Sequence, residues 1–101
     1  MEVNIKDNNG EKYIKLIGDL DGVSSNDVTE KVLKVAEENS KIVIDMAECP
    51  YVSSAGLRTL LTIGKSVKLK KGQMHIINLV EEVKEVMEMT GFGNIFKEFE
   101  N

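Results

Sequence analysis

The sequence has few cysteine, proline and aromatic residues. Among 101 residues there are one Cys, one Pro, two Tyr, three Phe and no Trp. Because Cys49 has no partner within the chain, a disulfide-stabilised scaffold is excluded, and a reducing, cytoplasmic compartment is expected. One histidine and one cysteine are too few to supply the usual ligands of a zinc site, so no metal is expected.

Long apolar runs and an excess of positive charge are absent as well. No segment approaches the roughly 20 consecutive apolar residues of a membrane-spanning helix, so no membrane insertion is expected. The first ten residues lack the basic and apolar regions of a signal peptide. A net charge of -4 argues against binding to nucleic acid, which depends on cations that neutralise phosphates.

The composition that remains is typical of a small folded domain. The chain is 42% hydrophobic and 30% charged, and it contains no repeat or linker. This length can bury a core large enough for independent folding. We therefore expect one domain over residues 1–101.

The first part of the chain predicts a β-hairpin followed by a helix. Alternating residues over 3–7 and 13–17 flank Asn9-Gly10, a pair that favours a tight hairpin turn. A hydroxyl in the segment 24–27 is expected to cap a helix whose inner face carries Val28, Val32, Val35 and Ala36. Asn39 is expected to end this helix.

The rest of the chain predicts two strand–helix pairs. The β-branched segment 41–47 indicates a strand buried on both faces, and 74–77 indicates another strand. A helix is expected from Ser53 or Ser54 to Lys71, with its inward residues Leu57, Leu60, Leu61, Gly64, Val67 and Leu69. Asn78 and Glu81 have capping-box spacing before a third helix.

The C-terminal residues leave the end of the chain undecided. Gly91 is expected to end the third helix, with Phe92 folding back onto Met87. Ile95, Phe96 and Phe99 fit either a short strand or a helical turn.

This order predicts an α/β fold with a mixed sheet. The sheet opens with the hairpin, and its core strands run parallel because helices connect them by right-handed crossovers.

Residues with catalytic chemistry are scarce. His75 lies within a strand pattern, which favours a solvent-facing or hydrogen-bonded side chain over a catalytic base. Cys49 beside Pro50 is better explained as a packing residue than as a reactive thiol. The segment Ser53-Ser54-Ala55-Gly56-Leu57 is different, because two hydroxyls stand at a helix start. The small residues Ala55 and Gly56 are expected to leave these hydroxyls uncrowded, so that another protein could approach closely. Helix capping and a contact with another protein explain this segment about equally well.

The sequence resembles the STAS domain of bacterial anti-sigma factor antagonists over essentially its whole length. The resemblance rests on four segments: Gly18-Asp19-Leu20-Asp21, Ile44-Asp45-Met46, Tyr51-Val52-Ser53-Ser54-Ala55-Gly56-Leu57 and Thr90-Gly91-Phe92. It implies a STAS-like fold and a switch protein, with no enzymatic activity and no cofactor. Such a protein binds an anti-sigma factor that is itself a serine kinase, and so releases a sigma factor.

The resemblance also implies the site residues. The kinase would phosphorylate Ser54 and switch the antagonist off, and a phosphatase would reverse the reaction. The loop aspartate of the family corresponds to Asp21. The implied partner-binding residues are Asp21, Ser53, Ser54, Ala55, Gly56 and Leu57.

Departures from the family pattern keep other functions open. Ser53 stands where the family motif has Asp, and Ala55 replaces a second hydroxyl. The main alternative is therefore a STAS adaptor in a lipid-transport, transporter or signalling assembly that is not phosphorylated. Two further alternatives are a receiver domain phosphorylated on Asp45 and a hydrolase or transferase that pairs Ser54 with His75.

Overall fold

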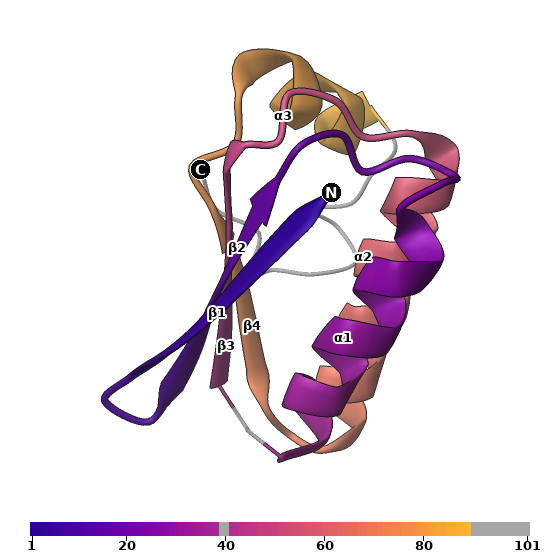
Figure 1. The fold of residues 1–101 in the computed structure, drawn as a ribbon. Helices are drawn as coiled ribbons and strands as arrows, with labels where there is room; N and C mark the ends of the chain where they lie inside the picture. The colour runs from indigo at the N-terminus through magenta and orange to yellow at the C-terminus, as the bar shows by residue number, and fades with distance from the viewer. Residues whose placement is uncertain (39–40, 90–101) are drawn as a thin grey trace.

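A computed structural model describes residues 1–38 and 41–89 of the chain (Figure 1). The elements are the strands and helices β1 (Glu2–Asn8), β2 (Glu11–Ile17), α1 (Ser25–Glu38), β3 (Lys41–Glu48), α2 (Ser54–Leu69), β4 (Gln73–Ile77) and α3 (Glu81–Met89). Their order is the predicted one. The predicted ends at Asn39 and at residues 90–92, like the undecided tail, lie outside the described residues.

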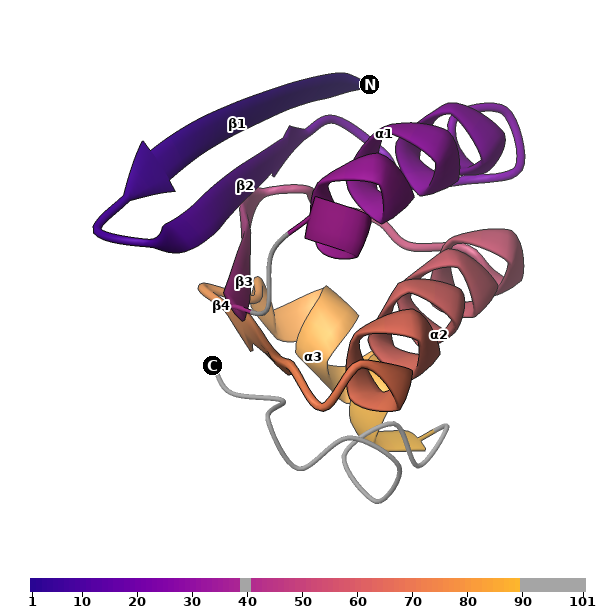
Figure 2. The ribbon, with the colours of Figure 1, turned by 90° about the horizontal axis from the view of Figure 1, so that it is seen from below.

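The four strands form one mixed sheet in the order β1-β2-β3-β4. β1 and β2 are antiparallel, whereas β2, β3 and β4 run parallel. Asn9 and Gly10 have φ values of 54° and 89°, as the predicted hairpin turn requires. The parallel strands follow one another in sequence order, so crossovers of one hand place α1 and α2 on the same face (Figures 1 and 2). The predicted fold class is confirmed.

The core lies between the inner face of the sheet and the helices. Its buried side chains follow a period of two along the strands and a helical period along α1 and α2. They include Ile14, Leu16, Ile42, Ile44, Met46, Val28, Val32, Ala36, Leu60, Ile63 and Val67. Val35, Leu57 and Leu61 are partly buried and pack against this core.

Three local predictions are wrong. Leu69 is 85% exposed, because the core-facing stripe of α2 ends at Val67 and the helix ends at Leu69. Asn78 does not cap α3: its φ is 59°, and the first helical hydrogen bond runs from the Lys84 N–H to the Val80 carbonyl. β3 is only partly buried on its outer face, where Val43 is half-buried.

The parallel strands bring three loops to one end of the sheet. The loops after β2, β3 and β4 all leave from the carboxyl ends of their strands, the edge where open α/β sheets commonly bind ligands. The loop after β2 contains Asp21, and the loop after β3 leads to Ser53 and Ser54. Within residues 1–38 and 41–89, no helix is long and apolar enough to cross a membrane.

Candidate functional site

The loops that carry Asp21 and Ser53 are joined by backbone hydrogen bonds. The Leu20 N–H donates to the Tyr51 carbonyl at 2.9 Å, and the Ser53 N–H donates to the Leu20 carbonyl at 2.9 Å. Leu20 and Val52 thereby form an isolated parallel bridge beyond the ends of β2 and β3. These contacts bring the two segments together from positions some thirty residues apart.

Gly56 allows this close approach. A Cβ atom at position 56 would overlap the carbonyl oxygen of Leu20 and would lie 2.9 Å from its Cγ and 3.0 Å from Val52 Cγ1. The residue is buried. It therefore holds the first turn of α2 against the Leu20 loop, whereas the sequence suggested that it keeps the hydroxyls open to a partner.

The two serines at the start of α2 have different surroundings. Ser53 is the N-cap residue, with extended backbone angles (φ -85°, ψ 176°), and its Oγ accepts a hydrogen bond from the Gly56 N–H at 3.2 Å. Ser54 is the first helical residue and is exposed. Within the described part of the chain its hydroxyl makes no hydrogen bond. Ser53 thus caps the helix, and the exposed Ser54 hydroxyl stays available for contacts with other molecules.

Asp21 organises the neighbouring loop. Its carboxylate accepts hydrogen bonds from the N–H groups of Val23 (3.0 Å) and Ser24 (3.1 Å), and its carbonyl accepts from the Ser25 N–H at the start of α1. These hydrogen bonds, first that from Ser24, lower the pKa of Asp21 below its usual value. Asp21 is therefore charged at neutral pH.

A fourth local prediction, a hydroxyl from the segment 24–27 that caps α1, is also wrong. Ser24 Oγ donates to the Asp19 carbonyl at 2.9 Å and accepts from the Asp21 N–H at 3.1 Å, so it bonds the loop and not the helix. The Ser24 carbonyl accepts the first helical bond, from Val28.

The remaining predicted site residues lie in the first turn of α2. Ala55 is half-buried and lines an open hollow of about 480 Å³ between α1 and α2. Leu57 is half-buried and packs against the core. The structure thus places Asp21 and residues 53–57 in one region, with Gly56 beneath its surface.

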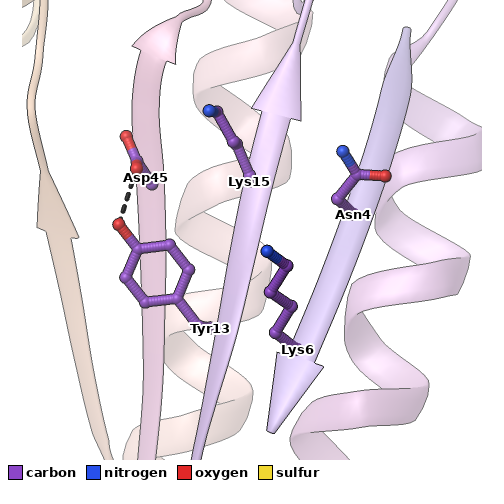
Figure 3. Close-up of a pocket in the computed structure, with 5 residues that line it drawn as sticks. All are labelled: Asn4, Lys6, Tyr13, Lys15 and Asp45. Atoms are coloured by element: carbon purple, nitrogen blue, oxygen red, sulfur yellow. Dashed lines mark hydrogen bonds between the residues drawn. The ribbon is translucent and has the colours of Figure 1, made fainter. Parts of the chain in front are cut away.

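A second polar cluster lies on the outer face of the sheet, and its contacts were not predicted from the sequence (Figure 3). The Asp45 carboxylate accepts hydrogen bonds from the Tyr13 hydroxyl at 2.6 Å, the Ala47 N–H at 3.0 Å and Asn78 Nδ2 at 3.2 Å. With Asn4, Lys6 and Lys15, Tyr13 and Asp45 line a hollow of about 260 Å³. The available signal was an aspartate inside a β-branched strand.

In the Asp45 cluster, hydrogen bonds and a nearby positive charge compensate for the burial of the carboxylate. Asp45 is only 6% exposed, and burial alone would raise its pKa. The hydrogen bonds from Tyr13, Ala47 and Asn78, together with the charge of Lys15, outweigh burial and lower the pKa of Asp45. The hydrogen bond to Asp45 correspondingly raises the pKa of Tyr13.

The structure gives no support to either enzyme-like alternative. A receiver aspartate must be accessible, but Asp45 is buried and accepts three hydrogen bonds. On β4, Met74 and Ile76 face the core, so the alternating His75 faces outward, away from the helix layer that carries Ser54. Cys49 is fully buried and burial raises the pKa of its thiol, as expected for a packing residue.

Two curated bacterial proteins resemble the chain in sequence. BtrV of Bordetella bronchiseptica, classed as an anti-sigma factor antagonist, is 34% identical over 67 residues, which are 66% of this chain and 58% of BtrV. The anti-sigma-B factor antagonist of Bacillus subtilis is 26% identical over 95 residues, which are 94% of this chain and 87% of that protein.

Solved structures share the fold at lower identity. A Thermotoga maritima protein classed as an anti-sigma factor antagonist has a TM-score of 0.89 at 17% identity, covering 98% of this chain and 86% of that one. Phosphorylated Bacillus SpoIIAA has a TM-score of 0.75 at 14% identity, covering 99% and 92%. The murine anion transporter Slc26a9 has a TM-score of 0.74 at 17% identity, covering 84% of this chain and 14% of the transporter.

The family model described as "STAS domain" matches residues 2–101. This match includes both loops and the first turn of α2. The chain belongs to the STAS domain family.

Proposed function

We propose that this chain is an anti-sigma factor antagonist. In this proposal it binds an anti-sigma factor that is a serine kinase, and so releases a sigma factor. Phosphorylation of Ser54 by that kinase switches the antagonist off, and a cognate phosphatase restores it. The docking surface comprises Asp21, Ser53, Ser54, Ala55 and Leu57, with Gly56 supporting it from below.

The observation that carries the proposal is the division of work between the two serines. Ser53 caps α2, so the exposed Ser54 hydroxyl is not needed for the helix. A hydroxyl that can be modified without breaking a cap lets the folded domain tolerate the phosphate. The hydrogen bonds around Leu20 meanwhile fix its position beside the Asp21 loop.

A phosphate on Ser54 would act mainly on the complex. It adds about -1.5 to -2 charges, and the positive end of α2 offsets this by about 0.3–1 kcal/mol in the free domain. At an effective dielectric of 20 and about 8 Å, each pair of like charges across the interface costs about 2 kcal/mol. Together with steric exclusion, a penalty of about 3 kcal/mol weakens binding more than a hundredfold.

The relatives support this assignment. Both curated relatives are classed as anti-sigma factor antagonists, and SpoIIAA has been solved in unphosphorylated and phosphorylated forms. Such a protein acts in the cytoplasm, where sigma factors work, and regulates by binding alone. The separation of Ser54 from His75 supports a function without catalysis.

A second candidate keeps the fold and removes the modification. Slc26a9 shows that a domain of this fold occurs within an anion transporter. Ser53 stands where the family motif has Asp, so a kinase that requires this charge would not modify Ser54. In this case the same surface would serve a permanent adaptor.

The deciding experiment mixes the purified chain with its cognate anti-sigma factor kinase and ATP and locates phosphate by mass spectrometry. We expect one phosphate, on Ser54, and none in Ser54→Ala. Ser53→Ala controls for the neighbouring hydroxyl and should still be modified. Binding without any phosphate would favour the adaptor, and phosphate on another residue would overturn the assignment of Ser54.

A further inference from the structure

The charge of α2 differs from that of the other two helices. From Ser54 to Leu69 it carries Arg58, Lys65 and Lys68 and no acidic residue. Acidic residues outnumber lysines four to two in α1 and four to one in α3. A net charge of -4 for the whole chain makes this basic helix a local exception.

Arg58 lies at the position on α2 from which it can reach Ser54. It is exposed and follows Ser54 by four residues, so both lie on one side of the helix. It also lines the hollow of about 480 Å³ between α1 and α2. The other lining residues are uncharged and include Asn26, Thr29, Thr59 and Thr62.

The hollow has a fixed polar wall. Thr29 Oγ1 donates to the Ser25 carbonyl at 2.7 Å, and the Thr29 and Thr59 hydroxyls lie 3.1 Å apart. These contacts join α1 to α2 beside Arg58, and Thr59 is only 5% exposed.

Arg58 has no acidic partner within the described residues. The ion pairs there include those of Lys15 with Glu48, Lys31 with Asp27 and Lys12 with Asp7. Its guanidinium is therefore available to a carboxylate from another protein or to a new anion on α2.

We propose that Arg58 couples the phosphorylation state of Ser54 to partner binding. This inference rests on the proposed function. When Ser54 is unmodified, Arg58 pairs with a carboxylate that the anti-sigma factor inserts into the hollow. When Ser54 is phosphorylated, Arg58 pairs with the phosphate one turn before it. The modification thus adds negative charge and also withdraws the cation that the partner needs.

Helix geometry favours the second pairing. Side chains on a helix lean toward its N-terminus, so Arg58 covers the turn that begins with Ser54. An anion four residues before a cation is the more favourable order. A guanidinium can also bind two phosphate oxygens at once, which lysine cannot do with its single ammonium group.

The test uses the full chain with phosphoserine installed at position 54 during synthesis, so no kinase is needed. A phosphorus NMR titration measures the second pKa of the phosphate, which is ordinarily about 6. Because Arg58 favours the dianion, we expect Arg58→Gln to raise this pKa by about 0.2–0.4, and 1 M salt to remove most of the difference. Lys65→Gln, about three turns from Ser54, is the matched control.

The phosphate pKa in Arg58→Lys should lie between the values in the wild type and in Arg58→Gln. A proton–nitrogen NMR spectrum of each variant checks that the fold is intact, which we expect because Arg58 is exposed. If Arg58→Gln changes the phosphate pKa no more than Lys65→Gln does, the inference is overturned.

A binding titration with the cognate anti-sigma factor tests the proposed contact between Arg58 and a carboxylate of the partner. In the unmodified chain, Arg58→Gln should weaken binding about tenfold and Lys65→Gln less than twofold; equal effects would overturn the partner contact. Failure here leaves the proposed function standing if phosphorylation of Ser54 still abolishes binding. The opposite outcome is also distinguishable. If Arg58→Gln raises the phosphate pKa as expected but the kinase does not modify Ser54, the proposed function is refuted and the Arg58–phosphate pairing stands.

Discussion

Ser54 and Asp45 lie on two parts of the same small fold, and their polar groups differ in burial and in hydrogen bonding. The Asp45 carboxylate is buried on the sheet face and accepts hydrogen bonds from Tyr13, Asn78 and a backbone N–H. The Ser54 hydroxyl is exposed at the start of α2, and its neighbour Ser53 makes the helix cap. Asp45 thus contributes to the fold, whereas Ser54 contributes little.

This difference separates a polar residue with a structural role from one that we propose to be functional. A buried carboxylate must be hydrogen-bonded, so its partners explain why it is there. An exposed hydroxyl beside a completed cap has no such explanation, although the surrounding backbone is held firmly by the Leu20 bridge. Substitution of Asp45 should therefore affect stability, whereas substitution of Ser54 should affect binding.

The largest effect on stability is expected at Gly56, which supports the Ser54 region. Gly56→Ala places a Cβ against Leu20 and should destabilise the fold by about 1–3 kcal/mol, as measured by urea unfolding. Gly22→Ala is the control, because a Cβ there meets no atom within 4 Å. Equal midpoints for the two variants would show that the close approach to Leu20 is unimportant.

At the Asp45 cluster, removal of the acceptor should destabilise the fold by a comparable amount. Asp45→Ala leaves the Tyr13 hydroxyl and Asn78 amide without this partner and should destabilise the fold by about 1–3 kcal/mol. Asp7→Ala, which removes an exposed ion pair with Lys12, should cost less than about 1 kcal/mol. A folded Asp45→Ala protein that loses partner binding would break the separation between the two sites.

Substitutions of the two serines should differ in their effect on stability by the contribution of one helix cap. Ser53→Ala should lower the free energy of unfolding by about 1 kcal/mol, because it removes the acceptor for the Gly56 N–H. Ser54→Ala should change it by less than about 0.5 kcal/mol, as for surface positions in general. The same urea titration compares them, and a larger loss in Ser54→Ala would reverse their roles.

The smallest expected effect is a pH dependence that belongs to Asp45. Because its pKa is lowered in the folded state, its stabilisation is present above the unfolded value of about 3.9 and is lost as pH falls through the folded pKa. Unfolding measured from pH 7 to pH 2 should therefore show a steeper acid loss in the wild type than in Asp45→Asn. Parallel curves would mean that Asp45 is not held in its charged form.

Local sequence patterns were sufficient to predict the element order and the core. The hairpin turn at Asn9-Gly10 and the apolar spacing of α1 depend on neighbouring residues, and both were predicted. The role of Asn78 was not predicted, because an asparagine before a helix is found both as a cap and in left-handed turns. Its amide partner, Asp45, lies 33 residues earlier.

The candidate site was predicted in its residues but not in their roles. The sequence pointed to Ser53 and Ser54 together and left capping and partner contact equally open. Only the backbone geometry shows that Ser53 is the cap. Gly56 likewise looked like an opening for a partner, since its contact with Leu20 depends on a pairing of distant loops.

The most direct test of the central claim is the affinity of the cognate anti-sigma factor for three folded chains, measured by calorimetric titration. Ser54→Ala should bind like the wild type, and Ser54→Asp should bind at least about tenfold more weakly. Gln73→Glu, at an exposed position at the start of β4 and so at the opposite end of the sheet, controls for added charge and should have a smaller effect. Equal affinity of Ser54→Ala and Ser54→Asp would contradict a charge-controlled docking site at Ser54.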